Sequence, residues 1–165
     1  MSNTTNVLPK DSGSRREFST GAHRDAASGK GRCDLLPLKE VAFAMNDPVI
    51  SEIAKFTEDF NQQHLANALQ EASKRLNVYG SMANMMLEVS ILYEAGAIKY
   101  GENNWQKGIP THCYIDSAIR HYLKYLRGDK DEPHNRAFVW NLICCIWTCM
   151  NKPELNDYAK RNEEE

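Results

Sequence analysis

The chain has 165 residues, of which 42% are hydrophobic and 25% are charged, a composition typical of an ordinary globular protein. This length allows one domain with a substantial core, but not two comfortable ones. The formal net charge of −2 gives no overall positive field to recruit nucleic acid, so we expect no nucleic-acid partner. Any anionic ligand must therefore be bound by a local cluster of cations.

Targeting and cysteine patterns restrict where the protein works. Residues 1–11 are polar and lack the apolar segment of a signal peptide. The most apolar run, residues 137–150, is shorter than the roughly 20 residues that a bilayer-spanning helix needs. We therefore predict a cytoplasmic protein with no membrane partner. The cysteines include no Cys-x-x-Cys pair, which predicts buried reduced thiols rather than disulfides or a zinc site.

The two ends of the chain differ from its middle. Residues 1–34 are rich in Ser, Thr, Gly, Asn and charged residues and have almost no apolar periodicity, which predicts a flexible arm. Basic side chains stand among the glycines of this arm, so it either closes over an anionic ligand or remains a solvated tail. Residues 156–165 form a charged tail.

Residues 35–155 show the periodicity of a single helical domain. A first helix is expected over residues 38–45, and Asp47 before a proline is typical of a helix N-cap. Over residues 49–76 apolar side chains recur at helical spacing, which predicts one or two amphipathic helices with a break near 61–64.

The second half of the chain predicts three further helices. Residues 82–100 are apolar on nearly all sides and should be buried. A loop at 101–111 precedes an amphipathic helix at 115–127, which Gly128 ends. A last, mainly apolar helix runs over 133–150. Because strand signals are weak, the predicted fold class is all-α.

Two acidic side chains stand in the apolar helix predicted at 82–100. Glu88 and Glu94 each need a cation, a metal or a hydrogen-bond donor, because a buried unpaired carboxylate is costly. They are six residues apart, so their directions differ by about 120° and both need not face one site. The alternative is an ion pair with Arg120, Arg127 or a neighbouring subunit.

Carboxylates and an imidazole gather before the last helix: Asp129, Asp131, Glu132 and His134. Acids at a helix N-terminus commonly just cap it. However, Asp131, His134 and Asn141 fall on one side of the following helix, which favours an inward-facing site. Oxygen-rich groups of this kind suit Mg²⁺ or Mn²⁺.

The polar face of the 115–127 helix carries Arg120, His121, Lys124 and Arg127, close to this acidic turn. Such a mixture is what a metal–polyphosphate site needs, because acids hold the metal and Arg or Lys neutralises phosphate oxygens. An amphipathic helix that simply faces water would explain the same residues.

Several nucleotide-enzyme motifs are absent from the sequence. It contains no Gly-x-x-x-x-Gly-Lys-Ser/Thr loop and no strand-linked Gly-x-Gly-x-x-Gly, so phosphates are not bound in a P-loop or Rossmann manner. No Gly-x-Ser-x-Gly elbow is present. No histidine stands next to an aspartate, which argues against the HD-type phosphohydrolases.

Short runs of residues from 16 to 141 carry a resemblance to a known family. They are 16–22 (REFSTGA), 29–32 (GKGR), 34–37 (DLLP), Glu94 with 96–101 (GAIKYG), 104–108 (NWQKG), 116–121 (DSAIRH), 131–134 (DEPH) and 140–141 (WN). Together and in this order they resemble the phage and prophage dATP/dGTP diphosphohydrolases, a group of MazG-like nucleotide pyrophosphohydrolases.

The resemblance implies an all-α helical bundle that hydrolyses a purine deoxynucleoside triphosphate, dATP or dGTP, to the monophosphate and pyrophosphate. It also implies Mg²⁺ or Mn²⁺ as cofactor, a homo-oligomer (dimer or tetramer), and the cytoplasm of a bacterial or phage-infected cell. Residues 39–80 match little of the family and suggest an inserted helical pair. Ile91 stands where a paired glutamate would precede Glu94. The alternative is therefore a non-catalytic helical nucleotide-binding or assembly module.

Three overlapping groups of site residues follow from the pattern and the resemblance. The predicted catalytic residues are Glu94, Asp131 and His134. The predicted metal ligands are Glu88, Glu94, Asp129, Asp131 and Glu132, with His134 as a further candidate. The predicted substrate-binding residues are Lys30, Arg32, Lys99, Tyr100, Asn104, Trp105, Arg120, His121, Lys124 and Asn141.

The substrate-binding residues have distinct predicted roles. Lys99, Arg120 and Lys124 would bind phosphates, and Lys30 and Arg32 would close the arm over them. Trp105 and Tyr100 would stack on the purine, and Asn104 or Asn141 would read its edge. Packing at a loop hinge is the alternative for Trp105.

Overall fold

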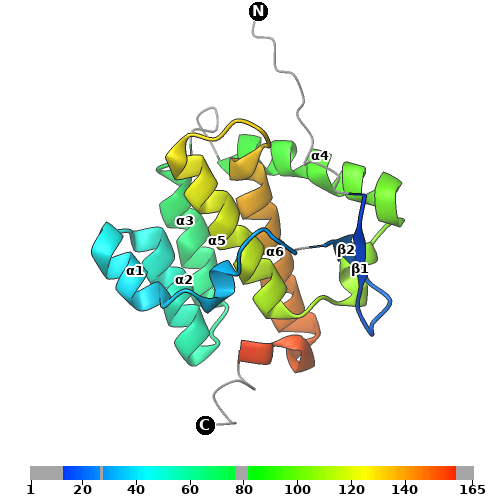
Figure 1. The fold of residues 1–165 in the computed structure, drawn as a ribbon, viewed down its shortest axis with the longest axis horizontal. Coiled ribbons are helices and arrows are strands. Elements are labelled where there is room, and N and C mark those ends of the chain that lie inside the picture. Colours follow the sequence, from blue (N-terminus) through cyan, green and yellow to red (C-terminus); the bar gives the residue numbers. More distant parts are fainter. Residues whose placement is uncertain (1–12, 27, 77–81, 159–165) are drawn as a thin grey trace, which may run out of the picture.

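The computed structural model of the chain describes residues 13–26, 28–76 and 82–158. Within these ranges it contains six α-helices, one two-stranded hairpin and short 3-10 turns, so the all-α prediction is confirmed. Two helices, α5 (Thr111–Arg127) and α6 (His134–Asn151), pack together at the centre. The helices α1–α3 lie on one side of this pair, and α4 and the hairpin lie on the other (Figure 1).

Residues 38–73 fold into three helices packed in sequence: α1 (Leu38–Met45), α2 (Pro48–Asp59) and α3 (Gln63–Ser73). The predicted break near 61–64 is confirmed, and α3 also contacts α6. Asp47 caps α2 as predicted, because its carboxylate accepts hydrogen bonds from Val49 N at 2.9 Å and Ile50 N at 3.1 Å. Residues 77–80 of the predicted inserted segment lie outside the described residues.

Helix α5 begins four residues earlier than the sequence predicts. The cap comes from the far end of the chain, where Asp157 accepts hydrogen bonds from His112 N at 3.0 Å and from the Thr111 hydroxyl at 3.1 Å. No local pattern reveals a cap supplied from 45 residues away. At its other end α5 stops as predicted at Gly128, which has a φ of +92° and donates its N–H to Lys124 O.

The polar face of α5 is largely buried, so it does not match the alternative in which this face simply contacts water. Asp116 and Ser117 are buried, while the apolar Leu126 is 43% exposed. Asp116 faces the docked N-terminal segment, because it accepts a hydrogen bond from the Cys33 backbone at 2.6 Å. The helix is therefore covered on both faces over most of its length.

The described part of residues 1–34 is folded onto the helices, which differs from the predicted flexible arm. Strands β1 (Arg15–Glu17) and β2 (His23–Asp25) pair as a hairpin. The turn between them buries Phe18 and Ala22 against the helices. The hairpin needs tertiary support, because two strands alone are marginally stable in water. Residues 1–12 of the arm, and 159–165 of the predicted tail, lie outside the described residues.

Helix α4 (Met82–Tyr100) forms where predicted but is less buried than its composition predicts. One side packs on α6 and buries Met85, Val89 and Leu92. The opposite side carries Leu87, which is 69% exposed, and Ile98, which is 82% exposed. A single copy of the chain offers nothing to cover that side within the described residues.

Two smaller predictions concern thiols and membranes. All five cysteines are free, as predicted. Among the helices that the structure describes, none combines the length and apolar character needed to cross a bilayer.

Candidate active site

A cavity of about 1230 Å³ lies between the N-terminal hairpin, the C-terminal half of α4, the loop that follows it, α5 and the start of α6. These segments are far apart in the sequence, and Figure 1 shows α4 and the hairpin facing α5 and α6 across this region. Polar and charged side chains from each of them reach the cavity wall.

The cavity gathers most of the residues predicted from the sequence. All ten predicted substrate-binding residues line it, and so do Glu94, Asp131 and Glu132. Glu88, Asp129 and His134 do not line it. Glu88 forms an ion pair with Arg136, and its direction differs from that of Glu94 as helix geometry requires. The assignment of these residues to catalysis and metal binding stays a prediction.

Glu94 projects from α4 into the cavity wall and is solvent-exposed. It makes no hydrogen bond or ion pair with any residue that the structure describes. Asp131 and Glu132 line the same cavity from the turn before α6. Carboxylates from α4 and from the turn before α6 therefore face one space, as a metal–phosphate site requires.

Several predicted phosphate-binding cations already have partners. Arg32 donates two hydrogen bonds of 2.6 Å to Asp34. Arg120 pairs with Asp116 and donates to the backbone oxygens of Lys30 and Gly31 at 3.1 and 3.0 Å. The Arg120 contacts fasten the N-terminal segment to α5, whereas the Arg32–Asp34 pair lies within that segment.

Lys99 and Tyr100 converge on an aspartate that the sequence analysis did not single out. Both donate to Asp25 Oδ1, Lys99 Nζ at 2.8 Å and the Tyr100 hydroxyl at 2.6 Å. Burial, and then the hydrogen bond to Asp25, raises the pKa of Tyr100. This contact ties strand β2 to the end of α4 across the cavity.

Arg24 is a second site residue that the sequence analysis missed. Its guanidinium lies over the rings of Tyr114 and Trp140, with centroids 5.3 and 5.8 Å away, and Nη2 donates to Asn141 Oδ1. Nη1 is buried without a hydrogen-bond partner, and no described carboxylate pairs with the group. Only the folded hairpin brings Arg24 here, so no local signal in the glycine-rich segment would have found it.

The predicted base-reading residues are engaged in packing and backbone contacts. Trp105 packs edge-to-face against Tyr93 and Trp147, at centroid distances of 5.5 and 5.0 Å, which agrees with the hinge-packing alternative. The Asn104 side chain accepts from His23 N at 3.0 Å and donates to His23 O at 2.9 Å. Asn104 thereby clamps the hairpin to the loop after α4.

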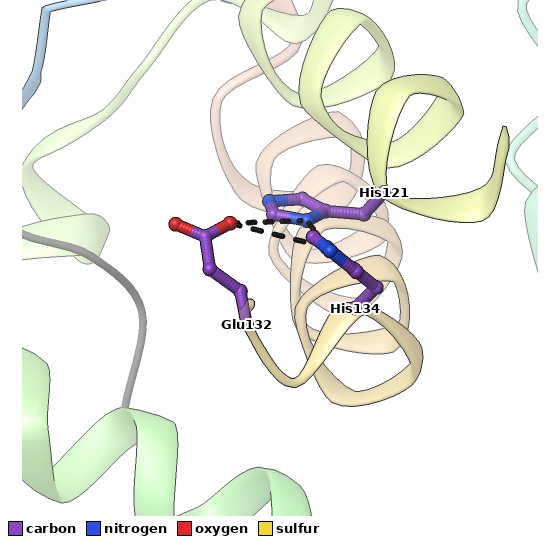
Figure 2. A group of neighbouring side chains, drawn as sticks. All are labelled: His121, Glu132 and His134. Carbon is purple, nitrogen blue, oxygen red and sulfur yellow. Dashed lines mark hydrogen bonds and ion pairs between the residues drawn. The ribbon is translucent and has the colours of Figure 1, made fainter. Parts of the chain in front are cut away.

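His121, in the C-terminal half of α5, forms a compact group with Glu132 and with His134, the first residue of α6 (Figure 2). The two Nδ1 atoms are 2.9 Å apart, and Figure 2 shows the Glu132 carboxylate facing both rings. Burial, and then the neighbouring His134, lowers the pKa of His121 to about 3. The hydrogen bond from His134 Nε2 lowers the pKa of Asp131 to about 2. At neutral pH the group therefore presents a neutral His121 beside ionised Asp131.

His112, in the first turn of α5, should make the free energy of unfolding depend on pH. Its ring forms hydrogen bonds with the Asp157 carboxylate and with the Cys113 thiol. These two hydrogen bonds raise the pKa of His112 to about 9. A raised histidine pKa stabilises the fold fully below the unfolded value of 6.5, and the stabilisation disappears as pH rises to about 9. Because the pair is partly exposed, we expect the free energy of unfolding to fall by about 1–2 kcal/mol over this range.

Chemical denaturation followed by circular dichroism at a series of pH values measures this loss. His112→Gln should flatten the profile between pH 6.5 and 9. An unchanged slope in that variant would show that another group titrates. Burial alone would raise the pKa of Asp157, but the hydrogen bonds from His112 lower it, so this partner adds stability that is lost only on strong acidification.

The structure thus defines an all-α domain with an open cavity whose wall carries both carboxylates and cations. The family model described as "dATP/dGTP diphosphohydrolase, N-terminal" matches residues 60–158, which is more than half of the chain. The chain belongs to this dATP/dGTP diphosphohydrolase family. Searches among curated proteins and among solved structures each found no match.

Proposed function

We propose that this chain hydrolyses dATP or dGTP to the deoxynucleoside monophosphate and pyrophosphate, with a divalent metal ion. The observation that carries the proposal is that Glu94, Asp131 and Glu132 line the same cavity as Arg24 and Lys124. Carboxylates there suit a metal-bound triphosphate, and the cations suit its phosphate oxygens. The family match supports the substrate class. A deoxynucleotide substrate is in keeping with a cytoplasmic enzyme.

The donor set fits a hard divalent cation. Glu94 offers a carboxylate without a partner among the described residues, and Asp131 and Glu132 offer two more from the facing turn. Oxygen ligands of this kind suit Mg²⁺ or Mn²⁺. When bound, such an ion would neutralise phosphate charge and lower the pKa of a water molecule.

The chain's own residues have separate tasks in the proposed reaction. Water adds to the α-phosphorus, the bond from that phosphorus to the bridging oxygen of the β-phosphate breaks, and pyrophosphate leaves. Glu94 accepts the proton that the attacking water loses. Arg24 and Lys124 stabilise the charge that develops on the phosphate oxygens. Lys30 and Arg32 hold the N-terminal segment over the substrate and exclude bulk water.

Steady-state turnover with each of the four dNTPs, with Mg²⁺ or Mn²⁺, tests the function. We expect pyrophosphate release from dATP and dGTP, and we expect Glu94→Gln to lower kcat by about 10²- to 10⁴-fold. Glu58→Gln is a matched control, because Glu58 lies on α2, pairs with Lys39 and does not line the cavity. Release of no pyrophosphate from any dNTP would refute the proposal.

We also propose that two copies of the chain associate through α4. Leu87, Ile91, Glu94 and Ile98 recur at spacings of four, three and four residues, so they share one face of that helix. Leu87 and Ile98 are largely exposed although they are apolar, which favours burial against an identical helix. Such a contact would bring a second Glu94 close to the first, where the proposed divalent ion would neutralise the two carboxylates.

Sedimentation velocity tests the association. The native chain should sediment as a dimer or tetramer, and Leu87→Glu should convert it to a monomer because the charge would be buried at the contact. Met150→Glu is a control, since Met150 is 66% exposed on α6 and lies outside the α4 face. A native chain that sediments as a monomer at micromolar concentration would contradict the proposal.

A further inference from the structure

His121, Glu132 and His134 bring three metal-ligating atoms to one point beside the cavity (Figure 2). The two Nδ1 atoms are 2.9 Å apart, and Glu132 Oε2 lies 3.9 Å from each. In a triangle with these sides, the point equidistant from the three atoms lies about 2.1 Å from each. That is the length of zinc bonds to imidazole nitrogen and carboxylate oxygen. A metal ion at that point would be at bonding distance from all three atoms.

Asp131 orients the deeper histidine of this group. His134 has a side chain that is 1% exposed, and its Nε2 lies 2.9 Å from Asp131 Oδ1. An ionised carboxylate accepts hydrogen bonds only, so the hydrogen of a neutral His134 resides on Nε2. The free lone pair is then on Nδ1, the atom that faces His121 and Glu132. A carboxylate that holds the far nitrogen of a ligating histidine is common support at protein metal sites.

A second arrangement of nearby groups, Asp129 with Asp131 and His134, is a weaker candidate. Asp129 is engaged by two hydrogen bonds from Arg127. In that arrangement His134 would have to ligate through Nε2, which Asp131 already occupies. An ion there would have to break both contacts, whereas an ion at the two Nδ1 atoms replaces the hydrogen bond between the histidines.

The open side of the group faces the substrate cavity. His121 and Glu132 line the cavity, while His134 lies behind them. Three protein ligands and one position open to a cavity are the usual arrangement of a catalytic rather than a structural zinc site. The open position would be taken by water or by a phosphate oxygen of the nucleotide.

We propose that Nδ1 of His121, Nδ1 of His134 and the Glu132 carboxylate bind a transition-metal dication of the Zn²⁺ or Co²⁺ type, in preference to Mg²⁺. Two imidazoles among three ligands suit such metals, whereas Mg²⁺ takes oxygen ligands. Only the role of the ion in holding phosphate rests on the proposed function. In this arrangement Glu132 is a ligand and Asp131 a positioning residue, so the ion that the triphosphate carries would be held by Glu94 and by the phosphate oxygens rather than by all three carboxylates.

Titration of the metal-stripped full-length chain with Co²⁺ tests the site without reference to activity. We expect one equivalent to bind with visible ligand-field absorption, Zn²⁺ to displace it, and a large excess of Mg²⁺ to leave it in place. His121→Ala and Glu132→Gln should each remove the absorption. Asp131→Asn should keep the one-to-one stoichiometry but weaken binding by about 10- to 100-fold, as the loss of a supporting carboxylate does.

His64→Ala is the matched control, because His64 bonds Glu52 and Asp59 on the far side of the helical bundle and does not line the cavity. It should bind Co²⁺ as the native chain does. Failure of the native chain to bind Co²⁺, displacement of Co²⁺ by Mg²⁺, or unchanged binding in the His121 and Glu132 variants would each overturn the site. If the native chain does not bind Co²⁺ but releases pyrophosphate with Mg²⁺, the proposed function stands and the His121–Glu132–His134 site fails. If it binds Co²⁺ but hydrolyses no dNTP, the site stands and the proposed function fails.

Discussion

Arg24→Ala is expected to raise the KM for dATP and dGTP by about 10- to 100-fold, which is the range for loss of a hydrogen bond to a charged group. Arg24 lines the cavity with Nη1 buried and unbonded and with no described carboxylate beside it. A cation in such surroundings is unfavourable until an anion binds. The free energy that phosphate binding gains at Arg24 therefore exceeds that at Arg32, which Asp34 already neutralises.

The stability of the same variant separates substrate binding from a structural role. Because Arg24 has no carboxylate partner among the described residues, relief of its buried charge offsets the loss of its contacts with Asn141, Tyr114 and Trp140, and we expect Arg24→Ala to change the unfolding midpoint little. Arg24→Lys should recover only part of the affinity, since a lysine lacks the planar guanidinium that lies over Tyr114 and Trp140. A native KM in Arg24→Ala, or a large loss of stability, would remove Arg24 from the phosphate site.

Asp47→Ala is expected to lower the free energy of unfolding by about 2–4 kcal/mol, from the combined loss of a helix cap and a buried hydrogen-bond acceptor. Asp47 is 4% exposed. Its carboxylate caps α2 and also accepts from the Tyr122 hydroxyl at 2.8 Å and from Arg75 at 3.1 Å. One side chain thus joins the α1–α3 unit to the centre of α5.

A double-mutant cycle with Tyr122→Phe measures the shared part of this energy by chemical denaturation. In the Tyr122→Phe background, Asp47→Ala should be less costly, because no buried hydroxyl is then left without a partner. Asp47→Asn, which keeps the capping oxygen, should be less destabilising than Asp47→Ala. A loss below about 1 kcal/mol in Asp47→Ala would show that the cap and the Tyr122 bond add little to stability.

Local signals in the sequence predicted the helices well where those signals act within a few residues. Asp47 before a proline marked the start of α2, and Gly128 marked the end of α5. Both devices work through backbone geometry and hydrogen bonds to neighbouring residues. The start of α5 was placed too late because its cap, Asp157, is remote in the sequence.

The candidate site divides in a similar way. Residues predicted from motifs and charge, such as Glu94 and Lys124, do line one cavity. Arg24 and Asp25 were not predicted, because the position of strand β2 depends on Asn104, which is remote in the sequence. The Asn104 side chain forms two hydrogen bonds with the His23 backbone. Their placement has no local signature.

The sequence by itself determined the helical class, most helix boundaries and the family, since periodicity, capping residues and short motifs are properties of neighbouring residues. Only the tertiary structure decided that the N-terminal segment folds into a hairpin over the cavity, that α4 keeps an apolar face uncovered, and that two histidine Nδ1 atoms meet Glu132. The reason is physical: these features depend on contacts between segments tens of residues apart, whose energies arise only when the whole chain is packed.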